Sequence, residues 1–227
     1  MALLGTAALA MWWEVDAPMR SEFEHWHTHE HFAERLGVPG FLRASRWTRA
    51  DGGPGIFVMY ELADHGVLHS SAYLAHLNAP TPWSTRMMPA HRNMVRSQCR
   101  VLESHGVGTA RLALTLRLSP AHGRDAQWLA ALRTRVETLP SQPGLAGAHL
   151  LRHEAPPIGP TEEQKMRGQT DRVADGVLVV LAYEAEPLQA LSDGELSDAS
   201  LRSIGAAAGA ERGLYALSCS ATPQDMR

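Results

Sequence analysis

Apolar positions along the first half of the chain follow two spacings, one typical of strands and one typical of helices. Residues 6–15 form a short apolar run between turn-forming residues, which predicts a strand buried on both faces. Residues 17–37 place apolar side chains three and four positions apart, with Asp16 as a cap and Gly37 at the end. This second stretch predicts a long amphipathic helix.

Further along, the pattern predicts a hairpin, two helices and a closing strand. The expected elements are strands at residues 41–48 and 56–62, helices at residues 70–77 and 83–96, and a strand at residues 97–104. The segment Asp51-Gly52-Gly53-Pro54-Gly55 consists of residues that favour a tight reversal, so it predicts the turn of the hairpin.

The second half repeats this order of elements, which indicates an internal duplication. Its expected elements are strands at residues 110–118, 145–153, 177–183 and 214–220, a helix at residues 125–139 and a helical region that ends near residue 204. Pro39-Gly40 and Pro143-Gly144 end the first helix of each half in the same way. Residues 155–176 have no periodicity and predict an insertion loop, with a lid as one interpretation.

The two halves, residues 1–106 and 107–227, have a physical reason to pack together. A four-stranded antiparallel sheet that is covered by helices on one face leaves its other face apolar and exposed. A second sheet covers that face, and we expect the two sheets to close around one cavity large enough for a small molecule. The sequence thus predicts an α+β protein in which one chain supplies both of the sheets that pack together.

Composition narrows the classes of partner. The 227 residues include 44% hydrophobic and 20% charged residues, which are ordinary values for a globular protein. A formal net charge of -3 provides no basic field for nucleic acid or an anionic membrane. No apolar run approaches the roughly 18 residues that span a membrane. Cys99 and Cys219 are expected to be structural thiols, which favours a cytoplasmic location.

Residues 26–41 carry the most specific pattern in the chain. They read W-H-T-H-E-H-F-A-E-R-L-G-V-P-G-F and are similar to the W-x-x-x-E-H-x-x-E-R-x-x-x-P-G-F pattern of uncharacterised bacterial EthD-like proteins. Tyr60-Glu61-Leu62 and Pro80-Thr81-Pro82-Trp83 belong to the same resemblance. The chain therefore resembles the dimeric α/β-barrel superfamily, which also contains antibiotic-biosynthesis-type monooxygenases and haem-binding relatives of chlorite dismutase.

That resemblance implies two tandem ferredoxin-like (βαββαβ) halves that form an α/β barrel with antiparallel sheets within one chain. Members of this superfamily carry out unrelated reactions on the same fold, so the resemblance does not imply one activity. The second half lacks the pattern of residues 26–41. Any activity is therefore expected in the first half, and the second half is expected only to form the opposite wall of the cavity.

His27 and His31 are the candidate catalytic residues. At 100° per residue they lie one turn apart on the predicted helix, beside Glu34 and next to an apolar stripe. One interpretation places both rings at the cavity mouth as a general base, a proton shuttle or a partner of an anion. The alternative is a solvated helix face in a chain with 12 histidines.

Residues 27–31 also match H-x-x-E-H, an inverted zinc-protease motif in which two histidines bind the metal and a glutamate activates water. We expect no metal centre, because the predicted fold differs from that of such proteases and no predicted helix supplies a third, acidic ligand. Glu30 is instead expected to pair with Arg35 and to brace the helix against the strands.

Four residues are candidates for substrate binding, namely Arg46, Tyr60, Tyr73 and Trp83. Arg46 would hold a carboxylate or phenolate if it pointed inward from its strand, and Tyr60 would donate a hydrogen bond from its hydroxyl. Tyr73 and Trp83 are typical of a packed core, and would suit a flat, apolar ligand if they lined the cavity.

These residues support three functions, each with a small-molecule ligand. The first is a cofactor-independent oxygenase or isomerase that acts on an apolar or aromatic acid, with His31 moving the proton. The second is a binding or scaffold protein, which a structure without a cavity near about 300 Å³ would favour. The third is a haem protein in which a histidine binds the iron. Whether two such barrels pair as a homodimer is left open.

Overall fold

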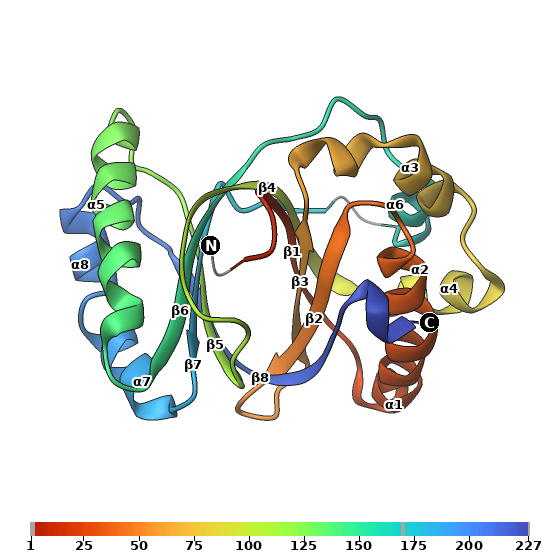
Figure 1. Cartoon of the computed structure of the whole chain (residues 1–227), viewed down its shortest axis with the longest axis horizontal. Helices are drawn as coiled ribbons and strands as arrows, with labels where there is room; N and C mark the ends of the chain where they lie inside the picture. Colours follow the sequence, from red (N-terminus) through yellow and green to blue (C-terminus); the bar gives the residue numbers. More distant parts are fainter. Residues whose placement is uncertain (1–2, 169–170, 227) are drawn as a thin grey trace.

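Strands that are apolar on both faces close into one antiparallel barrel, with helices on two opposite sides (Figure 1). The computed structural model describes residues 3–168 and 171–226. The strands of these residues are β1 (Ala7–Glu14), β2 (Phe41–Arg49), β3 (Gly55–Leu62), β4 (Arg92–Gly106), β5 (Leu112–Leu118), β6 (Leu145–His153), β7 (Gly176–Ala182) and β8 (Glu211–Ala221). Their order around the barrel is β1-β3-β2-β8-β5-β7-β6-β4, and β4 pairs with β1 to close it.

The same strand order occurs twice around this barrel. The first half supplies β4-β1-β3-β2 and the second supplies β8-β5-β7-β6. The halves are joined where β2 pairs with β8 and where β4 pairs with β6. The predicted α+β class and the antiparallel barrel are confirmed. The boundary at residue 107 and the duplication stay predictions, and this topology agrees with them.

Helices cover the outer face of each half. On the side of the first half lie α1 (Ala17–Trp26), α2 (Phe32–Leu36), α3 (Ser71–Asn78), α4 (Pro82–Met87) and α6 (Glu162–Met166). On the opposite side lie α5 (Asp125–Thr138), α7 (Ala185–Asp193) and α8 (Asp198–Ser203). Short 3-10 turns occur at His65–His69, Met88–Ala90, Leu139–Ser141 and Pro223–Met226. α6 belongs to the insertion between β6 and β7, yet it packs next to α3 (Figure 1).

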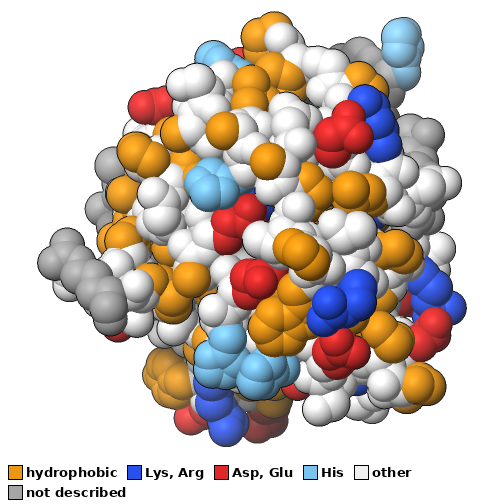
Figure 2. Space-filling view, turned by 90° about the vertical axis from the view of Figure 1, so that its right-hand side faces the viewer, with side chains coloured by type: hydrophobic (Ala, Val, Ile, Leu, Met, Phe, Trp, Pro, Cys, Tyr) orange, Lys and Arg blue, Asp and Glu red, His pale blue; other side chains and the backbone are white. Residues whose placement is uncertain are grey.

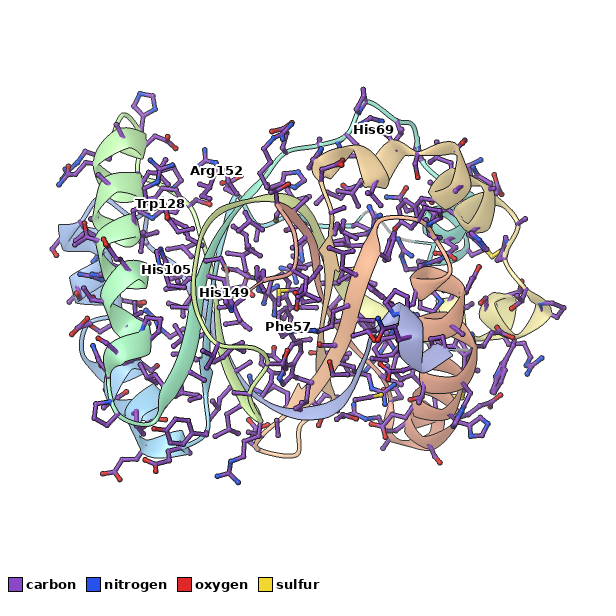
Figure 3. The ribbon with its side chains drawn as sticks, in the orientation of Figure 1. Phe57, His69, His105, Trp128, His149 and Arg152 are labelled. Carbon is purple, nitrogen blue, oxygen red and sulfur yellow. The ribbon has the colours of Figure 1, made fainter. Side chains whose placement is uncertain are left out.

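The inside of the barrel is a packed core. Trp12 and Trp47 each stack on Phe57, with ring centroids 5.0 and 5.1 Å apart. Figure 3 shows Phe57 within the barrel, and the Trp12 indole donates a hydrogen bond of 3.1 Å to Thr115. Alternation along each strand sends every second side chain inward, and side chains of this size fill an eight-stranded barrel. The candidate histidines face the other side of the sheet, so the expected position of the site between the two sheets is wrong.

The layers beneath the helices differ in chemistry between the halves. In the second half this layer consists of apolar side chains, mostly leucine with some valine and alanine, among them Leu114, Trp128, Leu132, Val136, Leu178 and Leu188. In the first half it also contains His27, His31 and Arg35, which are buried among aromatic side chains. Polar chemistry is therefore concentrated beneath the helices of the first half.

The predicted helix at residues 83–96 is wrong in its second part. α4 ends at Met87, a 3-10 turn follows, and β4 begins at Arg92. Pro89 lies in that turn, and a proline cannot donate the backbone hydrogen bond that a continuing helix needs. β4 is also longer than predicted, because residues 92–100 pair with β1 and residues 99–106 pair with β6.

The surface of the first half carries charges of both signs. Figure 2 shows the face above its helices, where acidic and basic side chains are interspersed with hydrophobic ones. A mixed surface of this kind lacks the continuous basic area that phosphate backbones attract. Within the described residues, no helix is both long enough and apolar enough to span a bilayer.

Candidate functional site

A π-helical turn, His27–His31, joins α1 to α2 at the candidate histidines. The backbone N–H of Phe32 donates to the carbonyl of His27, five residues earlier. Such a turn contains one more residue than the α-helix around it, and π-turns of this kind are frequent at functional sites. The sequence predicted one regular helix here, because hydrophobic spacing alone does not reveal an added residue.

His27 and His31 are buried, with 1% and 6% of each residue exposed, so the alternative of a solvated helix face is wrong. Their ring centroids lie 5.2 Å apart. His27 packs on Phe32 at 4.6 Å and His31 packs on Trp26 at 4.6 Å. Among the described residues, neither Nδ1 atom has a hydrogen-bond partner. Within this aromatic shell, Nδ1 of His27 therefore has no hydrogen-bond partner in the described part of the chain, and Nδ1 of His31 has only an ion pair with Glu34.

Both rings line a small cavity between the outer face of the sheet and the helices. β1 and β3 contribute Leu9, Met11 and Tyr60 to its wall, and α6 contributes Glu163. The cavity has a volume of about 30 Å³, which is the space of roughly one water molecule. This is far below the ligand-sized cavity that the sequence predicted. A substrate therefore requires the wall to move.

The residues present do not fit a haem. Pockets for drug-sized ligands measure about 300–1,000 Å³, whereas the space beside His27 and His31 is about 30 Å³. Large buried side chains, among them Phe32 and Tyr60, occupy the surrounding volume. We derive no step through an iron porphyrin for this site.

A larger open groove of about 370 Å³ lies at one end of the barrel, away from the histidines. Its charged side chains largely neutralise one another, since Arg49 pairs with Asp51 and Arg117 pairs with Glu211. None of the six catalytic and substrate-binding candidates lines this groove. It has the size of a ligand site, but no histidine of the described part of the chain lines it.

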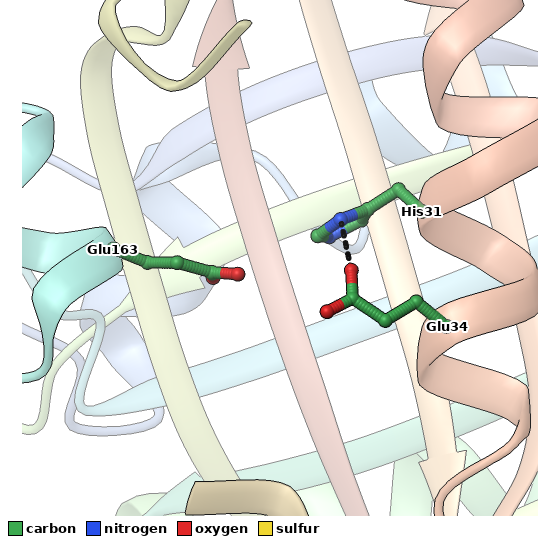
Figure 4. A group of neighbouring side chains, drawn as sticks. All are labelled: His31, Glu34 and Glu163. Carbon is green, nitrogen blue, oxygen red and sulfur yellow. Dashed lines mark ion pairs between the residues drawn. The ribbon is translucent and has the colours of Figure 1, made fainter. Parts of the chain in front are cut away.

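The carboxylates of Glu34 and Glu163 stand beside His31 (Figure 4), and the guanidinium of Arg35 pairs with both. Oε2 of Glu34 lies 3.6 Å from Nδ1 of His31, and Oε1 of Glu34 lies 3.4 Å from Nη1 of Arg35. Nη2 of Arg35 donates a hydrogen bond to Glu163. Ion pairs thus connect helix α2 to helix α6 across 128 positions of sequence.

The donor atoms of His31, Glu34 and Glu163 lie within 4.8 Å of one another, so these three residues have the spacing of a metal site. The guanidinium of Arg35 is already the counter-cation of both carboxylates. A divalent ion would have to approach this fixed positive charge. The cluster as it stands is therefore an ion-paired network rather than an open set of ligands.

Burial lowers the pKa of His27 well below its ordinary value, and the nearby charge of His31 adds to the effect. Burial and the charge of Arg35 also lower the pKa of His31. For Glu34, burial opposes ionisation, but contact with His31 and Arg35 outweighs it and lowers the pKa to about 2. Burial raises the pKa of Tyr60. At neutral pH the site therefore contains neutral imidazoles, a carboxylate and a neutral phenol.

These protonation states suit proton transfer. A neutral imidazole at His31 can accept a proton, and the carboxylate of Glu34 stabilises the imidazolium that forms. Arg35 offers a fixed positive charge, and the hydroxyl of Tyr60 has no hydrogen-bond partner among the described residues. That hydroxyl can stabilise negative charge that develops on a bound molecule, whereas the charge of Arg35 is already shared between Glu34 and Glu163.

The structure brings only some of the predicted substrate-binding residues to this cavity. Tyr60 and Tyr73 line it together with the two histidines. Arg46 points to the helix side but donates to the carbonyl of Glu24 at 3.2 Å, and does not line the cavity. Trp83 packs on His25 and is also outside it. Their predicted role in binding finds no support in this geometry.

Glu30 has a structural role. Its carboxylate accepts hydrogen bonds from Trp26, Thr81 and Ser84, which tie the π-turn to α4. The expected pair with Arg35 is wrong, because Arg35 pairs with Glu34 and Glu163 instead. The H-x-x-E-H match therefore does not form a zinc-protease arrangement, since its glutamate points away from the histidines' cavity.

Sequence reasoning missed Glu163 and the role of Arg35. The insertion does contain a helix signal, because Thr161 and Gln164 form a capping box at the start of α6. That signal predicts a helix but not its location. The distance of 128 residues between Arg35 and Glu163 hides their contact from any local pattern.

No family model matches the sequence, and no curated protein matches it. The fold is similar to that of a candidate monooxygenase from Fusobacterium nucleatum (TM-score 0.63, 11% identity, 97% of this chain and 96% of the other). It is also similar to an anthrone oxidase-like protein (0.63, 11%, 96% and 93%) and to a candidate monooxygenase from Lactobacillus acidophilus (0.60, 8%, 96% and 97%). At these identities the likeness shows a shared fold. The resemblance to EthD-like proteins stays a prediction.

Proposed function

We propose that this protein is an enzyme that binds a small, largely apolar molecule beside His31 and removes a proton from it, as cofactor-independent oxygenases and isomerases do. The observation that carries this proposal is the gathering, in one place, of buried polar atoms that have no hydrogen bond within the described part of the chain. They are Nδ1 of His27, Nδ1 of His31, Oε2 of Glu34, Nη1 of Arg35 and the hydroxyl of Tyr60.

Such atoms are costly to bury. An unsatisfied buried donor or acceptor costs about 1–3 kcal/mol, so a cluster of purely structural groups would be expected to pair internally. Here Nδ1 of His27 and the hydroxyl of Tyr60 have no hydrogen-bond partner among the described residues and line a cavity of about 30 Å³, while Nδ1 of His31 and Nη1 of Arg35 have only ion pairs with Glu34. A bound molecule that accepts and donates hydrogen bonds would satisfy them.

The chemistry follows from the protonation states. His31 takes a proton from an acidic C–H or O–H group, and Glu34 stabilises the resulting imidazolium. The hydroxyl of Tyr60 donates a hydrogen bond to the anion of the substrate. An isomerase would return the proton to another carbon, whereas an oxygenase would expose the electron-rich anion to O₂. The names of the similar structures, monooxygenase and anthrone oxidase-like, favour the second course.

Access to this site requires movement of the wall that α6 provides. Thr161, Glu163 and Gln164 line the cavity from the insertion. α6 is held to the first half through the Arg35–Glu163 pair and through a hydrogen bond from the backbone of Glu162 to Asn78. Displacing this short helix would join the space beside His31 to the surface, which supports a lid role for the insertion.

The proposal is tested by replacing His31. With anthrone and related compounds that carry an acidic C–H group as probes, we expect His31→Ala to lower turnover by about 10²–10⁴-fold, since it removes the general base. Consumption of O₂ and formation of product are the measurements. His29→Ala is the matched control, because His29 is exposed and lies only two residues away. Turnover that survives in His31→Ala would exclude His31 as the base.

One observation favours a second candidate, a binding or scaffold protein without catalysis. The cavity beside His31 has a volume of about 30 Å³, well below the roughly 300 Å³ at which ligand pockets begin. Wild-type protein that neither binds nor converts any probe, while its α6 remains closed, would support this alternative.

A further inference from the structure

We propose that Arg96 is the anchor for a carboxylate group, so that the substrates of the proposed site are monocarboxylic acids. This inference rests on the proposed function for its catalytic part, but its binding part stands on separate residues. Arg96 lies on β4 opposite Met11 of β1, with 8% of the residue exposed.

The guanidinium of Arg96 lacks a partner of opposite charge. Its one hydrogen bond among the described residues is from Nη2 to the hydroxyl of Tyr73, at 3.2 Å. No carboxylate of the described residues forms an ion pair with it. The other two arginines of the cavity wall differ in this respect, because Arg35 pairs with Glu34 and Glu163, and Arg167 pairs with Asp171.

An arginine in this state is set up to bind an anion. A guanidinium has five donors in a planar fork, and only one donor is used here. No donor of Arg96 is among the fully buried atoms without a partner in the described part of the chain, and the side chain lines two cavities, so its remaining donors can reach a bound carboxylate. A carboxylate also matches the fork with two parallel hydrogen bonds, which a neutral amide cannot offer.

Arg96 stands between two cavities. One is the space beside His31, and the other is an outer cavity of about 220 Å³ beneath the start of the insertion. Arg96 and Gln164 line both. The outer cavity is otherwise lined by Gln98 and by apolar residues of the insertion, among them Pro156, Ile158 and Pro160. The arrangement provides a guanidinium and an apolar wall next to the cavity that contains His31.

The ligand that fits this arrangement is a small organic acid with an apolar body. Its carboxylate would pair with Arg96, and its acidic C–H or O–H group would face His31. Arg46, the anchor expected from the sequence, is held by Glu24 and Ser218 and is not available for this role. The position of Arg96 thus supplies the specificity for acids.

The test compares acids with matched neutral molecules. Benzoate, 1-naphthoate and octanoate are titrated into the wild-type protein alongside the corresponding amides, with binding followed by calorimetry and ligand-observed NMR. We expect at least one acid to bind at least about tenfold more tightly than its amide. Arg96→Gln should abolish the preference for the acid over its amide, whereas Arg96→Lys should retain part of that preference.

Arg100→Gln is the matched control, since Arg100 lies on the same strand but is exposed and pairs with Glu154. It should keep the preference for acids. The proposal is overturned if no acid binds more tightly than its amide, or if Arg96→Gln retains the preference while its circular dichroism matches that of the wild type. His31→Ala should still bind the acids, so loss of turnover with intact binding separates the base from the anchor.

Discussion

Three histidines at the cavity, His27, His31 and His91, link the stability of this protein to pH. Burial lowers the pKa of all three, and that of His91 falls to about 3. In the unfolded chain each imidazole binds a proton near pH 6.5, whereas in the folded protein it stays neutral to lower pH. Below pH 6.5 the unfolded state therefore binds more protons, and acid favours unfolding.

We expect the free energy of unfolding to fall between pH 6.5 and pH 5, by up to about 1.4 kcal/mol per pH unit for each such histidine. Denaturant unfolding at a series of pH values measures this slope. Glu34, with a pKa of about 2, acts in the same direction but only below about pH 4.5. His91→Gln should reduce the slope and His29→Gln should not. A free energy that is constant over this range would contradict the neutral burial of these rings.

The sequence identified some residues of the site and not others, for physical reasons. His27 and His31 could be predicted because helical spacing places them on one face with Glu34. Tyr60 and Tyr73 were candidates and do line the cavity. Arg96 could not be predicted, since it fell at the end of a predicted helix that is in fact a strand. Strand alternation alone also cannot show that Arg46 finds partners at Glu24 and Ser218.

At the scale of elements, the contact between α2 and α6 depends on one ion pair. Glu163 is buried and bonds to Arg35 from a helix of only five residues. Glu163→Gln leaves Arg35 with Glu34 alone and removes the charge that holds α6 in place. We expect faster amide hydrogen exchange in residues 162–168, with little change in the barrel strands.

Glu162→Gln is the control for this experiment, because Glu162 is on the same helix but pairs with Lys165 at the surface. Its exchange pattern should match that of the wild type. Equal protection of α6 in Glu163→Gln and the wild type would mean that apolar packing, rather than the ion pair, holds the helix in place.

Most strands could be predicted from their apolar runs, and most of their bounds agree within a few residues. The π-turn and the docking of α6 could not. A π-turn leaves no signature in hydrophobic spacing, and the position of α6 depends on partners more than 80 residues away, such as Asn78 and Arg35. The start of β4 was missed because its first residues, Arg92 and Asn93, are polar.

At the scale of the molecule, the barrel interior makes the two halves one cooperative unit. Trp47 and Phe57 from the first half share a core with Val177 and Tyr215 from the second. Trp47→Ala should reduce the free energy of unfolding by about 3–5 kcal/mol, as large-to-small changes in a core do. Unfolding followed by tryptophan fluorescence and by circular dichroism should still show one coincident transition.

Tyr183→Ala provides the comparison, since Tyr183 is 54% exposed. A loss below about 1 kcal/mol in Trp47→Ala would indicate that the interior is loosely packed. Two separate transitions would indicate halves that fold independently. The closed barrel itself could be anticipated from apolar faces that need cover. The pairing of β2 with β8 and of β4 with β6 could not be predicted, because the sequence of an edge strand does not show which other strand it pairs with.

Closure within one chain has a consequence for how the protein can change. When a barrel is assembled from two identical subunits, every substitution appears in both. A change that improves one side of such a barrel is therefore also present on the other side, where it can be unfavourable. Here each position exists once. The apolar layer under α5 can therefore be selected for rigidity alone. The layer with the histidines, on the other side, keeps buried polar atoms that have no hydrogen bond among the described residues. The two sides of this barrel can thus change in sequence independently of each other, which two identical subunits cannot do.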